Sequence, residues 1–326
     1  MTVCFDAGGQ DYNPGMQLVI PGALPATAVA GELARHLPEH APTLSLWLAQ
    51  GQARVQGFDV RAQGCTAYEG WQVRAAGFTP TASQKLGAGL GPLLGGTQDE
   101  SPVWVADLVH LALGMDSANL LDPDLLQLQP DEGAALLQAA RDLLADGGFE
   151  AHALGPGRWR LSLPPGLQPD AASPAAVIGE RLQHWWTLDP ASRPWRRLLN
   201  DIQMAWYAHP VNEARSERGL PAVNGLWLYG GARPWALRAL PPVLAPELDT
   251  LARAGDWAAW LAALARLDRD HLRPLARPDG QPLQALQLVL LGRERQAEVT
   301  LNPRTGLRKW LPAPKTDWKR WWSSPV

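Results

Sequence analysis

The chain has 326 residues, of which 46% are hydrophobic, and its 29 basic and 32 acidic residues give a net charge of -3. This composition allows one large domain or two smaller ones, and it excludes a general attraction to nucleic acid or to an anionic membrane. The only cysteines, Cys4 and Cys65, exclude a disulfide framework and a multi-cysteine zinc site, so two reduced thiols are the default expectation.

No apolar run reaches the roughly 20 residues of a membrane-spanning helix, and the N-terminus lacks the pattern of a signal peptide. We therefore expect a cytoplasmic protein that binds no membrane. The excess of arginine over lysine, with abundant Ala, Gly and Pro, is typical of a GC-rich bacterial genome. Residues 1–15 precede the first strand-like segment, so we expect them to form a disordered arm or to follow a misassigned start.

The first third of the chain predicts short elements. Met16–Gly22 predicts a buried strand that ends in a Pro-Gly turn. The glycine-rich segment 87–96 predicts a flexible loop, because its spacing fits neither a dinucleotide-binding turn nor a phosphate-binding loop. Between these two segments, the pattern predicts helices at 26–36 and 41–53 and short strands at 58–62 and 70–75.

The middle of the chain contains Trp104–Leu113, an apolar segment with Asp107 and His110 embedded in it. On a helix these two residues would share a face, where they would bind one metal ion or form a buried structural pair. A helix is predicted from Pro130 to a stop at Gly147-Gly148, followed by a β-hairpin over 149–163. A helix packed on a hairpin is an α+β arrangement.

The second half predicts further helices and a final hairpin. The predicted helices are 175–186, 194–208, 210–217, 246–254 and 257–267, and the predicted strands are 226–229, 284–291 and 296–301. The tail 304–326 is basic and rich in tryptophan. We expect it to lie across the body with Trp310, Trp318, Trp321 and Trp322 as anchors; the alternatives are docking of a protein partner and stacking on single-stranded nucleic acid.

The segment from Asn200 to Gly231 carries the side chains best suited to recognition. The candidate ligand-binding residues are Asn200, Gln203, His209, Asn212, Arg215 and Asn224. Arginine offers forked donors for phosphate or carboxylate, and asparagine fixes orientation. These residues either converge on a small anion or form a structural network that joins two helices to a strand end.

The same segment resembles a known family. The resemblance rests on His209-Pro210-Val211-Asn212-Glu213-Ala214-Arg215, on Gly219-Leu220-Pro221 and on Asn224-x-Leu226-Trp227, with support from Asp107, His110 and Leu199–Met204. This pattern is similar to archaeal-type cofactor-independent phosphoglycerate mutases and closer to the bacterial RpfE-type regulatory proteins. The resemblance covers roughly residues 104–231.

The resemblance implies an α/β (α+β) fold with an inserted module. Residues 101–231 would form a substrate-recognising α+β module, inserted between the parts 16–100 and 232–326 of a reduced, phosphatase-like α/β domain. In the mutases, a separate domain with two metal ions and a serine nucleophile performs the chemistry. Here the strand at Met16 lacks the metal-binding Asp of that domain, and the seven histidines are scattered.

We therefore predict a non-catalytic bacterial regulatory or ligand-sensing protein, with no catalytic residue, cofactor or metal ion assigned. Its expected partner is a small anionic metabolite or a protein, and direct binding of nucleic acid is not expected. Two alternatives stay open: an active metal-dependent phosphomutase or phosphatase, and a protein–protein adaptor in nucleic-acid metabolism.

Overall fold

The computed structural model describes residues 16–97, 99–113, 118–185, 190–303 and 317–323. The chain has a mixed α/β fold, as predicted, and it forms two compact units. The first unit combines the chain up to Gly57 with 242–252 and the chain from Asp256 onward, and the second contains 58–241 and 253–255. The predicted module 101–231 therefore lies inside the longer second unit, and its role as an insertion stays a prediction.

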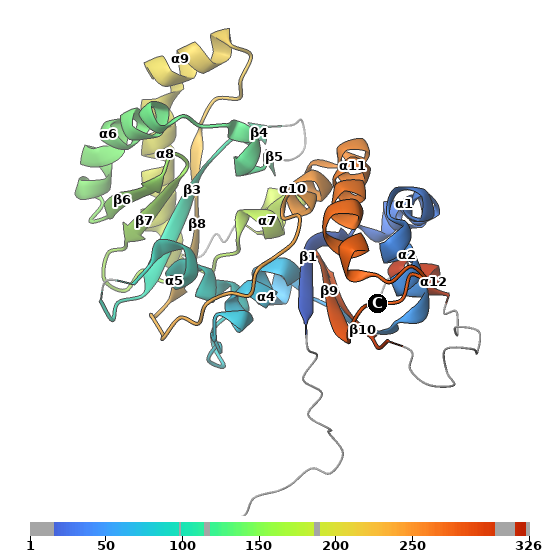
Figure 1. Ribbon diagram of the computed structural model, residues 1–326. Helices are drawn as coiled ribbons and strands as arrows, with labels where there is room; N and C mark the ends of the chain where they lie inside the picture. Colours follow the sequence, from blue (N-terminus) through green and yellow to red (C-terminus); the bar gives the residue numbers. More distant parts are fainter. Residues whose placement is uncertain (1–15, 98, 114–117, 186–189, 304–316, 324–326) are drawn as a thin grey trace, which may run out of the picture. The chain divides into compact units, whose positions relative to one another are not determined.

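The first unit contains a four-stranded sheet with the order β1-β9-β10-β2. Figure 1 labels three of these strands, β1, β9 and β10, next to one another. Its strands are β1 (Gln17–Leu24), β2 (Gln52–Gly57), β9 (Leu286–Gly292) and β10 (Arg295–Leu301). β1 runs parallel to β9, with Leu18 opposite Leu288, whereas β10 is antiparallel to both of its neighbours. The first and last strands of the chain thus share one sheet.

Helices cover this sheet and bury an aromatic core. They are α1 (Thr27–His40), α2 (Pro42–Gln50), α10 (Glu247–Ala254, in this unit up to Ala252), α11 (Trp257–Leu267) and α12 (Trp318–Ser323). Trp47 of α2 and Trp260 of α11 are fully buried, and their indole N–H groups donate to the carbonyls of Gly280 and Gly22, both at 3.0 Å. Each indole therefore enters the core with its polar group satisfied.

α12 supports the expectation that the tail anchors on the body. Trp318 and Trp322 are buried in the core of the first unit, with Trp321 packed against it. The backbone carbonyl of Trp322 also accepts a hydrogen bond from Arg295 at 3.0 Å. The other predicted anchor, Trp310, lies outside the described residues, as do the arm 1–15 and Cys4.

The second unit is built on an antiparallel sheet with the order β6-β7-β3-β8. Its strands are β3 (Val103–Val109), β6 (Glu150–Gly155), β7 (Arg158–Ser162) and β8 (Gly225–Ala232), and β4 (Leu111–Leu113) and β5 (Ala118–Leu120) form a separate small hairpin. Every residue of β3 is buried. Its apolar residues alternate between two core clusters, so both faces of the sheet are covered.

Different helices cover the two faces. Trp104, Ala106 and Leu108 share one core with α6 (Pro130–Asp146) and α8 (Arg193–Tyr207). Val105 and Val109 share the other core with α4 (Ala67–Ala75), α5 (Leu90–Gly95) and α7 (Pro174–Val177). The remaining helices of this unit are α3 (Val60–Gln63) and α9 (Pro210–Glu217). Cys65 is a free, buried thiol in the second of these cores.

Several predicted elements were wrong. The strands predicted at 58–62 and 70–75 are the helices α3 and α4, because Asp59 caps the first and Thr66 forms a capping box with Glu69 at the start of the second. The predicted flexible loop 87–96 is a 3-10 turn followed by α5. The predicted helix 175–186 is reduced to α7 and a short 3-10 turn at 182–184, and Trp186 is outside the described residues.

In the part of the chain that the structure describes, no helix is long and apolar enough to cross a membrane.

Candidate functional site

The predicted recognition segment folds into α8, α9 and β8. α9 begins at Pro210, which suits the first helical position because proline lacks the N–H that a helix leaves unpaired there. His209 has extended backbone angles and caps this helix: its Nδ1 accepts the N–H of Val211 at 3.2 Å. His209 therefore fixes the corner between α8 and α9.

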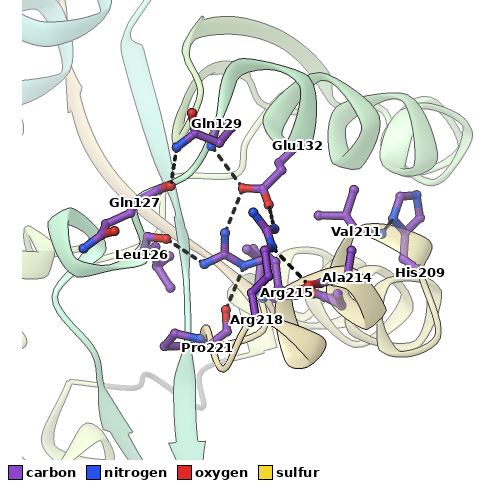
Figure 2. A network of polar contacts seen from close by, with 12 residues as sticks. Leu126, Gln127, Gln129, Glu132, His209, Val211, Ala214, Arg215, Arg218 and Pro221 are labelled. Atoms are coloured by element: carbon purple, nitrogen blue, oxygen red, sulfur yellow. Dashed lines mark hydrogen bonds and ion pairs between the residues drawn. The ribbon is translucent and has the colours of Figure 1, made fainter.

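Arg215 is completely buried, and each nitrogen of its guanidinium group donates to a protein oxygen (Figure 2). Nη1 binds Glu132 of α6 at 2.8 Å, Nη2 binds the carbonyl of Leu126 at 2.6 Å, and Nε binds the carbonyl of Pro221 at 2.8 Å. Glu132 also pairs with Arg218. Arg215 thus links α9 to α6, to the 3-10 turn that ends at Leu126 and to the loop at Pro221. Its side chain has no exposed surface that an external anion could contact.

The environment of Glu132 favours its ionised form. Burial alone raises the pKa of this carboxyl, but the backbone N–H of Gln129 and the guanidinium groups of Arg218 and Arg215 outweigh that effect and hold its pKa below the usual value. The carboxylate therefore stays charged opposite two arginines. This ion pair links α6 to α9.

Two of the three asparagines that the sequence singled out, Asn212 and Asn224, also bind backbone groups. Nδ2 of Asn212 donates to the carbonyls of Trp206 and Val223, and its Oδ1 accepts the N–H of Val223, all at 2.8 Å. Asn224 makes a matching pair of bonds to the N–H and carbonyl of Leu111, at 2.7 and 3.0 Å. Of the two interpretations drawn from the sequence, the structural network is the one that describes Asn212, Arg215 and Asn224.

Gln203, Asn212 and Asn224 nevertheless border a common surface depression, which we call the α8–α9 groove. It has a volume of about 880 Å³, and its lining also includes Tyr207, Ala208, Glu213, Ser216, Glu217 and Ala222. Asn200 is exposed on α8 but is not part of this lining. The structure thus brings together three of the six predicted residues, in a groove whose charged members are acidic.

Asp107 and His110 are not on a helix: Asp107 belongs to β3, and His110 follows that strand. Arg158 binds both oxygens of Asp107, at 2.6 and 2.9 Å, and the Tyr229 hydroxyl donates to it at 3.1 Å. Burial raises the pKa of Asp107, and the two donors oppose this rise. Nδ1 of His110 lies 2.8 Å from the carbonyl of Ala222. The two residues therefore have separate partners.

A second groove lies at the other end of β8, and sequence reasoning missed it. This β8 groove has a volume of about 910 Å³, and its lining includes Phe78, Lys85, Trp104, Arg233 and Trp235. Phe78 and Trp235 are in ring contact, with centroids 4.8 Å apart. Nζ of Lys85 lies 2.7 Å from the carboxylate of Asp170, which also borders the groove.

Two glycines in the last part of β8, Gly230 and Gly231, shape this groove. Gly231 has a φ of +99°, and a Cβ atom there would lie 2.5 Å from the Trp104 ring. Glycine therefore allows the indole to lie directly against the strand end. The sequence predicted that the strand stops before this glycine pair, but β8 continues through it to Ala232. No local pattern placed Lys85 and Arg233, which are almost 150 residues apart in the chain, in one groove.

No protein-family model and no curated protein matches this sequence. Several solved structures match, and two of them are similar to this chain over most of their length. A cofactor-independent phosphoglycerate mutase from Thermoplasma acidophilum has 13% identity and a TM-score of 0.31, covering 88% of this chain and 89% of its own. A protein from Pyrococcus horikoshii has 11% identity and a TM-score of 0.39, covering 89% of this chain and 88% of its own.

These values are too low to carry an assignment of function. The class that the structure itself defines is a mixed α/β protein of two units. The closer resemblance to RpfE-type proteins stays a prediction from the sequence.

Proposed function

We propose that this protein is a non-catalytic, ligand-sensing protein and that its ligand, a small anionic metabolite, binds in the β8 groove. The observation that carries the proposal is the lining of that groove, where Lys85 and Arg233 lie among three aromatic rings. The volume of about 910 Å³ falls in the range of small-molecule sites.

The charges of the β8 groove suit an anion better than those of the α8–α9 groove. Arg233 is exposed, and its guanidinium group can grip a phosphate or carboxylate with two parallel donors. Lys85 is paired with Asp170, so an incoming anion competes with that carboxylate for the ammonium group. In the α8–α9 groove, by contrast, Glu213 and Glu217 would repel an anion.

Thermal-shift measurements with a panel of phosphorylated and carboxylated metabolites test this proposal. A ligand at about 100 times its Kd should stabilise the folded protein by about 2.7 kcal/mol. Arg233→Ala should abolish the shift, whereas Arg197→Ala, an exposed arginine of α8, should preserve it. If no anion stabilises the protein, or if the shift survives Arg233→Ala, the proposed site is wrong. Turnover of phosphoglycerate in the presence of divalent cations would contradict the non-catalytic part.

A second candidate function, docking of a protein partner, rests on a separate observation. Met204 and Tyr207, three residues apart on α8, are 77% and 86% exposed, and Tyr207 borders the α8–α9 groove. Large exposed side chains beside Glu213 and Glu217 fit a partner segment that carries basic and apolar residues. A photo-crosslinker at position 207 should then capture one defined partner, with a yield that falls as salt is raised; a salt-independent or diffuse pattern would oppose this function.

A further inference from the structure

The last turn of α1 presents three potential metal ligands on one face. The inward side of this helix is apolar, with Ala30, Leu33, Ala34 and Leu37 buried in the core. His36 and Glu39 are exposed and His40 is partly exposed on the outward side. This cluster belongs to the first unit and has no part in the grooves described above.

The geometry of the cluster is close to that of a chelating site. His36 and His40 are four residues apart, so a helix places them one above the other. Their ring centroids are 6.4 Å apart, and one ligand atom from each of His36, Glu39 and His40 lies within 4.8 Å of the other two. In a tetrahedral zinc site with bonds of about 2.1 Å, ligand atoms are roughly 3.4 Å apart. Rotation of the exposed side chains to neighbouring rotamers can bring the ligand atoms from within 4.8 Å of one another to this shorter spacing.

The backbone beneath the cluster is held in place. α1 ends at His40, Ala41 is fully buried, and α2 starts at once with Pro42. The carboxylate of Asp268 accepts the N–H groups of Leu44 at 2.7 Å and Thr43 at 3.3 Å. Burial of Ala41 and the hydrogen bonds to Asp268 therefore hold the backbone at the corner between α1 and α2. Binding of a metal ion would then need to order only the side chains of the cluster, and not the backbone.

We propose that His36, Glu39 and His40 bind a divalent transition-metal ion of the zinc type. Two imidazoles and one carboxylate suit zinc, cobalt or nickel, whereas magnesium and calcium prefer oxygen ligands alone. Three protein ligands leave the fourth tetrahedral position open to solvent or to a group from outside the chain.

Two charged neighbours frame the site without blocking it. One oxygen of Glu32 lies 3.5 Å from Nε2 of His36, one helical turn earlier. The other oxygen pairs with Arg35 at 2.6 Å. The carboxylate of Glu32 therefore offsets the positive charge of Arg35, which would otherwise repel a bound metal ion. The same carboxylate can orient the imidazole of His36 through a hydrogen bond.

Calorimetric titration of the full-length, chelator-treated protein with Zn²⁺ tests this proposal. We expect one ion per chain, with affinity reduced at least about tenfold in His36→Ala and in His40→Ala. His152→Ala, which removes an exposed histidine of the second unit, should bind as the unaltered protein does. Because the altered side chains are exposed or, for His40, partly exposed, circular dichroism should show the same fold in all variants.

Spectroscopy gives a second readout. X-ray absorption of the zinc-loaded protein should show two imidazole nitrogens at about 2.0 Å, and Glu39→Gln should change the oxygen shell but not the nitrogen shell. Equal affinity in His36→Ala and the unaltered protein, or no binding at all, would overturn the proposal, as would a zinc spectrum without histidine ligands.

Discussion

Arg215 shows how a residue suited to recognition can serve the fold instead. Its guanidinium group has no exposed surface and three protein acceptors. Burying a charge costs several kcal/mol unless its partners restore the lost hydration. The acceptors are the carboxylate of Glu132 on α6 and the backbone carbonyls of Leu126 and Pro221. Arg215 therefore holds α9 against elements that lie some 80 residues earlier in the chain.

Replacement of Arg215 should therefore destabilise the second unit strongly. Arg215→Ala removes one partner of a buried ion pair and leaves two carbonyl groups without their donor, so we expect a loss of about 3–5 kcal/mol in urea unfolding. Arg218→Ala is the matched control. Arg218 pairs with the same carboxylate, but its side chain is 49% exposed, so its replacement should lower the free energy of unfolding by no more than about 1 kcal/mol. Similar losses in the two variants would argue against the structural role of Arg215.

Glu132 should make the stability depend on pH in the acid range. Its pKa is lower in the folded protein than in the unfolded chain, so the stabilisation is complete above the unfolded value of about 4.3 and is lost as the pH falls through the folded value. Urea unfolding between about pH 6 and pH 3 should show a smaller loss of stability on acidification in Glu132→Gln than in the unaltered protein. An equal or steeper loss in the variant would contradict this assignment.

At the scale of elements, the end of β8 depends on glycine. Gly230 and Gly231 both have positive φ, and they leave room for Gly91 and for the Trp104 ring. A side chain at either position would separate β8 from its neighbours. It would also move an aromatic wall of the β8 groove.

Gly231→Ala should therefore lower both stability and ligand binding. Backbone strain and the clash with Trp104 together should cost about 2–4 kcal/mol in thermal unfolding. Gly219→Ala measures the backbone strain without a clash. Gly219 has a φ of +70°, but a Cβ atom there would meet nothing within 4 Å. This substitution should therefore lower the free energy of unfolding by only about 1 kcal/mol. If the two variants lose the same stability, the contact with Trp104 does not matter.

The sequence predicted elements well where their ends carry local signals. α9 and α11 have the predicted bounds, because Pro210 starts one and Asp256 caps the other. α3 and α4 were missed although Thr66 and Glu69 form a capping box, because a short apolar pattern outweighed that signal. The helix considered for Asp107 and His110 is a strand, because an apolar run of ten residues does not distinguish a helix from a strand buried on both faces.

The candidate site was harder to predict than its elements. Asn212 and Arg215 are three residues apart and are both buried on α9. What they bind depends on Glu132, Leu126 and Val223, and the first two of these are more than 80 residues away from Arg215 in the chain. The β8 groove unites residues from four separate segments of the chain, so no local pattern could reveal it.

At the scale of the whole molecule, each unit has its own hydrophobic core. The core of the first unit includes Trp318 and Trp322 of α12, and among the described residues none beyond Trp235 belongs to the two cores of the second unit. The stability of each unit should therefore respond to its own substitutions.

Calorimetry should resolve this separation. Trp322→Ala should lower one thermal transition, with a cost of about 3–5 kcal/mol for the emptied core position, whereas Arg215→Ala should lower another. A single transition that shifts equally in both variants would show that the units unfold as one. Phe149→Ala, which also alters a buried aromatic residue but in the second unit, should behave like Arg215→Ala.

The parallel pairing of β1 with β9 also has a consequence for synthesis on the ribosome. The second unit consists almost entirely of one continuous stretch, 58–241, and can fold while the chain is still growing. β1 must wait until β9 and β10, some 270 residues later, have left the exit tunnel. Until then the apolar strand Gln17–Leu24 lacks its neighbour, and this interval is when the nascent chain most needs protection by chaperones.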